Sequence, residues 1–125
     1  MQMGEFKQLV MRLNNKVNME IFSQGLHKQK VDVIGDKILI TAQNNRVKIL
    51  SLVDQSDMTT SRKMDLALIK EFKTRFIAYM DEYMGIKVLT HMKDYDPHLE
   101  LSLSVTILDR SVEELLPNIV LLKNP

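Results

Sequence analysis

The sequence predicts an α+β fold: a two-layer sandwich with a four-stranded, mostly antiparallel sheet and two long helices on one face. Three observations support this prediction. Two long stretches carry apolar side chains at helical spacing, two others alternate with the period of a β-strand, and glycines separate these stretches. Their order along the chain is α-β-β-α-β-β, so the predicted architecture consists of two successive helix–hairpin units.

The first predicted helix runs from Glu5 to Gln24, and Gly25 is its expected C-terminal stop. Its apolar stripe is expected to face the core and contains Phe6, Leu9, Val10, Leu13, Val17 and Ile21. Three further apolar residues, Met11, Met19 and Phe22, lie off this stripe. They are either scattered surface residues or a second contact face for another subunit, and both interpretations stay open.

The first predicted hairpin spans residues 30–42, where apolar and polar side chains alternate on both sides of Gly35-Asp36. Glycine at the first central position favours a type II′ turn, whose twist matches that of the strands. The next apolar segment, residues 46–54, fits neither the helical nor the strand period. Residues 55–62 are polar and predict a loop, in which Thr59, Thr60 or Ser61 would cap the following helix.

The second long helix is predicted over residues 63–84, with Gly85 as its stop. Its wide apolar face is expected to pack in the core and contains Leu68, Ile69, Phe72, Phe76, Tyr79, Met80 and Tyr83. After it, Ile86 to Leu108 predicts a β-hairpin with strands over residues 86–93 and 99–108.

The last predicted strand alternates almost without interruption. We expect Leu99, Leu101, Leu103, Val105 and Ile107 on its buried side, and Glu100, Ser102, Ser104 and Thr106 on its wet side. Residues 111–116 predict a helical turn that Pro117 limits. Residues 118–125 predict a tail, whose apolar side chains are available to dock against the core or a partner.

Composition sets the limits on function. The chain is expected to be a single domain over residues 1–125, with residues 110–125 as a C-terminal extension. With 17 basic and 16 acidic residues, the net charge of +1 predicts no global field for nucleic acid or for an anionic membrane. Cysteine is absent, which excludes disulfides, thiol catalysis and cysteine–zinc sites. Neither a signal peptide nor a membrane span is indicated, so we expect a cytoplasmic protein.

One group of residues has the chemistry of a metal site. His91, Asp94, Asp96 and His98 surround the turn of the second hairpin, and imidazole and carboxylate bind zinc and other divalent metals. Their spacing matches no known metal motif, and Asp before Pro is ordinary turn chemistry, so the sequence favours a structural turn. No phosphate-binding glycine loop or nucleophile elbow is present. We therefore expect no catalytic residues, no cofactor and no enzymatic activity.

Three segments resemble the small bacterial family named for MpsC, the third component of a sodium-translocating, membrane-potential-generating system. They are Gly25 with the strand and hairpin that end in Lys37-Ile38-Leu39-Ile40, then Lys73-Thr74-Arg75-Phe76 leading into Met84-Gly85-Ile86-Lys87-Val88, and finally Asp94-Tyr95-Asp96-Pro97 with the strand after it. The resemblance covers residues 5–108. The chain departs from the family at Gly25-Leu26, where Gly-Pro is common, and near Arg46-Val47, where a Thr-Pro or Ala-Pro helix start is absent.

The resemblance implies a short helix over residues 46–54. It also implies a non-enzymatic accessory or regulatory protein of a cation-translocating membrane system that is linked with bicarbonate supply. We expect a homodimer that binds a membrane-protein partner, does not itself enter the membrane and binds no nucleic acid. The second hypothesis is a metal-dependent enzyme or sensor that uses the four residues of the second turn. The third is a module that binds a small ligand on the sheet face.

Overall fold

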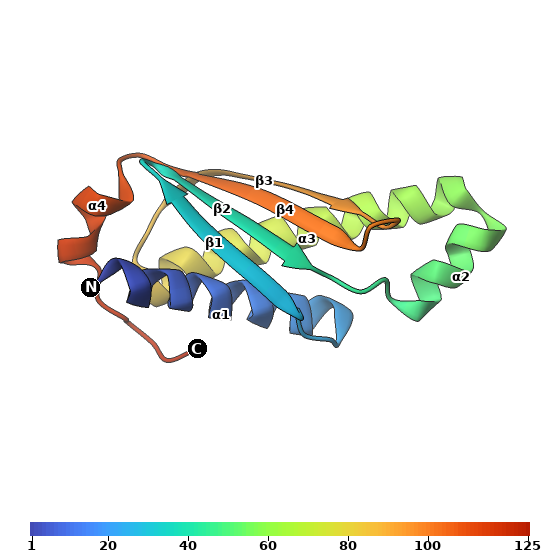
Figure 1. Ribbon diagram of the computed structural model, residues 1–125, viewed down its shortest axis with the longest axis horizontal. Coiled ribbons are helices and arrows are strands. Elements are labelled where there is room, and N and C mark those ends of the chain that lie inside the picture. Colours follow the sequence, from blue (N-terminus) through green and yellow to red (C-terminus); the bar gives the residue numbers. More distant parts are fainter.

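The computed structural model describes all 125 residues and confirms the α+β fold (Figure 1). Its elements are α1 (Met3–Phe22), β1 (Lys28–Ile34), β2 (Lys37–Gln43), α2 (Lys48–Ser56), α3 (Met58–Met84), β3 (Val88–Asp96), β4 (Leu101–Leu108), α4 (Val112–Leu115) and a final 3₁₀ turn (Leu116–Asn118). The four strands form one antiparallel sheet in the order β1-β2-β4-β3. Helices α1 and α3 pack against one face of it, and the other face is open. None of the helices combines the length and apolar character that a membrane span requires.

The apolar stripe of α1 forms one side of the core, as predicted. Five of its six residues are buried: Phe6, Leu9, Val10, Leu13 and Val17. The predicted stop at Gly25 is wrong, because the helix ends two residues earlier. Ser23 takes the left-handed conformation, with φ of 57°, and its backbone N–H donates to the carbonyl of Met19.

The first hairpin follows the prediction closely. Val31, Ile38, Ile40 and Ala42 are buried beneath the helices. Gly35 has a φ of +59°, whereas Asp36 has no positive φ. A positive φ at the first central residue alone is the signature of a type II′ turn, so the predicted turn is confirmed.

The middle of the chain is helical throughout. Residues 46–54 contribute to α2, but the predicted loop over residues 55–62 is wrong. Only Asp57 interrupts the helical conformation, and it also caps α3, since its side chain accepts a hydrogen bond from the backbone N–H of Thr60. One extended residue with a good capping side chain is enough to separate two helices. Helix α3 then buries Phe72, Phe76, Met80 and Tyr83 and ends at Gly85, with a φ of +67°.

The second hairpin has the predicted place but the opposite orientation. Strand β3 extends three residues further than predicted, β4 begins two residues later, and residues 97–100 form the turn. The buried side of β4 carries Ser102, Ser104, Thr106 and Leu108, whereas Leu101 and Leu103 are 40% and 47% exposed. The prediction that the leucines face the core is therefore wrong. The phenyl rings of α3 and the imidazole of His91 occupy the layer above β3 and β4, and small side chains leave room for them.

The C-terminal segment is anchored to the core rather than free. Ser111 caps α4 by accepting from the backbone N–H of Glu114, and Pro117 lies in the 3₁₀ turn that follows. Ile119 is buried, and the backbone N–H of Leu122 donates to the carbonyl of Tyr83. Val112 is also buried, whereas the side chains of Val120, Leu121 and Leu122 are exposed.

Candidate functional site

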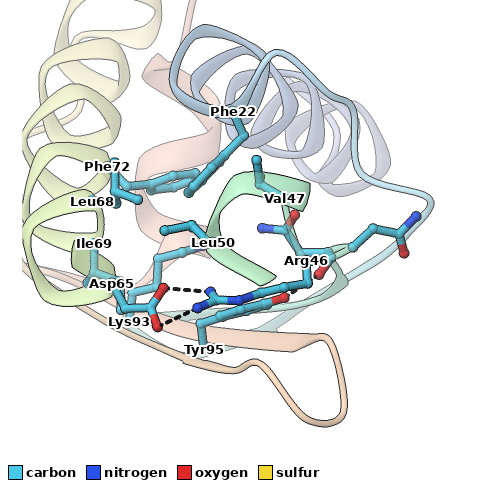
Figure 2. A pocket seen from close by; sticks show the side chains of 12 residues that line it. Phe22, Arg46, Val47, Leu50, Asp65, Leu68, Ile69, Phe72, Lys93 and Tyr95 are labelled. Atoms are coloured by element: carbon cyan, nitrogen blue, oxygen red, sulfur yellow. Dashed lines mark hydrogen bonds and ion pairs between the residues drawn. The ribbon is translucent and has the colours of Figure 1, made fainter. Parts of the chain in front are cut away.

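A narrow pocket lies where the end of α1, helices α2 and α3 and strand β3 meet (Figure 2). Its lining residues are Phe22, Asn44, Asn45, Arg46, Val47, Leu50, Asp65, Leu68, Ile69, Phe72, Lys93 and Tyr95. The cavity volume is about 30 Å³. A water molecule needs roughly 10–15 Å³ by this measure, so the pocket has room for about two waters or for a ligand of a few atoms.

Arg46 organises one wall of the pocket. Its guanidinium donates hydrogen bonds to both carboxylate oxygens of Asp54 and of Asp65, at 2.6–3.1 Å, and to the hydroxyl of Ser61. Its backbone N–H donates to the carboxylate of Glu100 at 2.6 Å. One residue at the end of β2 therefore ties together α2, α3 and the turn of the second hairpin. We call Arg46, Asp54, Ser61 and Asp65 the Arg46 clamp.

The clamp holds its charges in a fixed arrangement. Hydrogen bonds from Arg46 and then from Ser61 lower the pKa of Asp54 to about 2. Burial works against the charged form of Arg46, but the hydrogen bonds to Asp54 and Asp65 outweigh it and raise the pKa of the guanidinium. The guanidinium also lies 5.7 Å from the ring centre of Tyr95 (Figure 2). Because its donors are already engaged, Arg46 acts as a structural clamp and not as a free anion site.

Lys93 is the pocket's charged side chain without a hydrogen-bond or ion-pair partner. Its ammonium lies 3.8 Å from the ring centre of Phe72. Burial lowers the pKa of Lys93 to about 8. The uncharged amine is therefore more accessible near neutral pH than in an exposed lysine. A desolvated amine of this kind can accept a proton, pair with a small anion or attack an electrophile.

His91 lies deeper under α3, on the same inward face of β3. Its ring centre is 4.6 Å from that of Phe76, and its Nδ1 is hydrogen-bonded to the hydroxyl of Thr106 at 2.8 Å. Burial first, and the charges of Lys93 and Lys73 second, lower the pKa of His91 to about 3. The imidazole is therefore neutral, and its Nε2 has no partner.

The four residues proposed for a metal site do not come together. His91 faces the helices, whereas Asp94 and Asp96 lie on the open face, because neighbouring residues of a strand point to opposite sides. Asp96 caps the turn by accepting from the backbone N–H groups of His98 and Leu99 at 2.9 and 3.0 Å. No group of three or more His, Asp or Glu residues has the geometry to hold a metal ion. The metal site that the sequence left open as the less favoured alternative is therefore not formed by these four residues, and Asp96 stabilises the turn instead.

The proposed partner residues on α1 do not form one exposed surface. Met19 is 46% exposed, but Met11 is partly buried against the core and Phe22 points into the pocket toward Phe72 (Figure 2). Sequence reasoning did not find the Arg46 clamp, whose acidic residues lie 8 and 19 positions further along the chain. It had one signal for Lys93, which alternates with His91 and Tyr95 along a single face of its strand.

No protein-family model, no curated protein and no solved structure matches the chain. The resemblance to the MpsC family therefore rests on the three segments quoted above and stays a prediction.

Proposed function

We propose that the protein is a non-enzymatic, cytoplasmic accessory or regulatory protein that binds a membrane-protein partner of a cation-translocating, membrane-potential-generating system. The sequence support is the resemblance to the MpsC family. The structural support is a protruding pair of helices, residues 48–66, which we call the α2–α3 arm. It extends beyond the end of the sheet (Figure 1).

The arm buries few side chains and exposes several apolar ones. Leu50 is the only buried residue of α2, whereas Ile49 and Leu52 are 64% and 56% exposed. Met58 and Leu66 on α3 are also exposed. A short helix that buries one side chain gains little from the hydrophobic effect, so the Arg46 clamp carries much of its attachment. A fixed helix that presents leucine and isoleucine to solvent is suited to docking against a protein.

A site-specific crosslink tests this proposal. A photoreactive amino acid replaces Leu52 in the full chain, and a matched control carries it at Gln55, a polar exposed position of the same helix. In native cells we expect a crosslink to one integral membrane protein from position 52, at several times the yield from position 55. Leu52→Glu should abolish copurification of that membrane protein and should leave the stability of the chain unchanged. Crosslinks to water-soluble proteins alone, or equal yields at both positions, would contradict the proposal.

A second candidate function is the binding of a small ligand in the pocket. The observation in its favour is the ammonium of Lys93, which has no hydrogen-bond or ion-pair partner, in a mostly apolar cavity. The size of the cavity limits the ligand to a few atoms, and the charge favours a small monoanion such as formate or acetate. Millimolar formate or acetate should raise the melting temperature of the wild type and of Lys73→Met, but not that of Lys93→Met. An equal shift in all three proteins would show a general salt effect and would exclude this function.

A further inference from the structure

The open face of the sheet is apolar along its centre. Leu101, Leu103, Val105 and Ile107 of β4 all point away from the helices, and Leu39 of β2 and Met92 of β3 pair with Val105 on the same face. The inward face of the same hairpin is polar, with buried Ser102, Ser104 and Thr106. Serine inside and leucine outside is an unfavourable distribution for a strand that stays exposed, and it becomes favourable once the open face is covered.

The two edges of this face differ in charge. Lys28, Lys30 and Asp32 lie on β1, at one edge, where Lys30 is 3.8 Å from Asp32, and Asp94 and Asp96 lie on β3, at the other. The strand register aligns the two lysines with the aspartates of β3 in two rows across the sheet: Lys28, Gln43, Leu101 and Asp96, and then Lys30, Thr41, Leu103 and Asp94. Each row therefore begins with a lysine and ends with an aspartate.

We propose that this face is a homodimer interface whose two-fold axis runs along the strands. Rotation about this axis places each row of one copy opposite the same row of the other and exchanges the two edges of the sheet. Strand β1 of one copy therefore lies over β3 of the other. Lys28 then faces Asp96 of the second copy, and Lys30 faces Asp94, each pair occurring twice. Packed sheets lie about 10 Å apart, a spacing that a long lysine and a short aspartate span together.

The other two-fold axis in the plane, perpendicular to the strands, gives a poorer match. It lays β1 over β1 and β3 over β3, and reverses the order of the rows. It brings Lys30 over Asp32 of the second copy, but Asp94 then faces Met92 and Asp96 faces Thr90, so four carboxylates lose water without gaining a cation. Of the carboxylates, the axis along the strands leaves only Asp32 of each copy opposite an apolar residue, Met92, and Asp32 keeps Lys30 of its own chain as a partner at 3.8 Å. Charge complementarity therefore selects the axis along the strands.

The size and shape of the face fit a second copy. Four strands of about seven residues span roughly 19 Å by 23 Å, or about 440 Å² on each copy, an area that corresponds to a weak, reversible interface. A depression on this face is lined in part by Lys28, Thr41 and Leu101. The axis along the strands places the partner's aspartate edge above it. The α2–α3 arm is not part of this face, so a dimer leaves it free to bind a different protein.

Sedimentation equilibrium of the full chain from about 1 to 300 μM tests the proposal. We expect a reversible dimer for the wild type. Lys30→Glu and Asp94→Lys should each weaken it by about tenfold, because each change places like charges at two symmetry-related positions. An equimolar mixture of the two variants should restore association to within about twofold of the wild type, since each heterodimer regains both opposite-charge contacts.

Three further variants complete the experiment. Leu103→Ser should weaken the dimer, whereas Lys63→Glu, an exposed position on α3, and Leu52→Glu on the arm should not change it. A wild type that stays monomeric at 300 μM would overturn the proposal. A mixture that associates no better than its components would exclude the axis along the strands. Neither result affects the arm, which the crosslinking experiment tests separately.

Discussion

The two hairpins of this protein share a topology and differ in what they bury. The β1–β2 hairpin turns Val31, Ile38 and Ile40 toward the helices and several charged side chains toward solvent. The β3–β4 hairpin turns His91 and three hydroxyl side chains toward the helices and a column of leucine, valine and isoleucine toward solvent. The hairpins are joined through β2 and β4 into one continuous sheet, so the character of each face changes halfway across it.

The helix above each hairpin explains the difference. Helix α1 contacts β1 and contributes aliphatic side chains, which pack well against valine and isoleucine. Helix α3 contacts β3 and contributes Phe72 and Phe76, whose rings lie against His91. Large rings in one layer require small residues in the next, because protein interiors are close-packed. The leucines of a strand can therefore point toward solvent when side chains from the helices already fill the layer on its inner face.

The largest expected effect comes from truncating an inward aliphatic side chain on the first hairpin, compared with an outward one on the second. Ile38→Ala should lower the free energy of unfolding by about 2–5 kcal/mol, since Ile38 is completely buried. Leu103→Ala should change it by less than about 0.5 kcal/mol in dilute, monomeric protein. Urea unfolding at about 1 μM measures both. Similar losses for the two variants would show that the hairpins do not differ in this way.

The Arg46 clamp holds α2 and α3 against the end of the first hairpin, and its loss should have the next largest effect. Arg46→Met leaves Asp54 without an ion-pair partner and Asp65 with only the half-exposed Arg62, and should lower the free energy of unfolding by about 3 kcal/mol. Arg62→Met is the matched control, because Arg62 pairs with the same Asp65 but is half exposed, and should cost less than about 0.5 kcal/mol. Comparable effects of both variants in urea unfolding would mean that burial does not strengthen the clamp.

Acid should weaken the same clamp. Asp54 has a folded pKa of about 2, below its ordinary value of 3.8. The stability that this difference provides is present above pH 3.8 and is lost as the pH falls toward 2. Arg46→Met should lose this part of the acid dependence, which urea unfolding between pH 5 and 2.5 measures.

The buried imidazole gives the second hairpin a pH dependence of its own. His91 has a folded pKa of about 3, so below pH 6.5 the unfolded chain binds a proton that the folded chain does not. The free energy of unfolding should fall by about 1 kcal/mol per pH unit as the pH decreases from 6.5 to 4.5. His91→Leu should remove this slope and His98→Gln, in the exposed turn, should keep it. If His91→Leu keeps this pH dependence, a titratable group other than His91 must cause it.

The smallest effect concerns the turn of the first hairpin. Gly35→Ala should cost about 1 kcal/mol, because a φ of +59° strains a residue that carries a Cβ. Gly4→Ala is the control, since Gly4 lies in α1 with open space around it and should be neutral or slightly stabilising. Thermal unfolding compares the two variants, and a stabilised Gly35→Ala would contradict the type II′ turn.

Local patterns were sufficient for much of this fold. The stripe of α1, the II′ turn and the stop at Gly85 each depend on residues close together in the chain, and each was predicted. The polar run over residues 55–62 predicted a loop, but the structure has a single extended residue there. Asp57 ends α2 and caps the start of α3. The Arg46 clamp could not be predicted, since its partners meet only after α2 and α3 fold back on each other.

The sequence by itself determined that β3 and β4 form a hairpin with two chemically different faces, because alternation of side chains is a property of any extended chain. Only the tertiary structure decided which face lies inside. That choice depends on how the rings of α3 fill the layer above the sheet, and they lie between 15 and 34 positions away from the residues they cover. The alternation of residues along β4 contains no information about packing against a distant helix. Its leucines therefore predicted a buried face, whereas in the structure they form the open face.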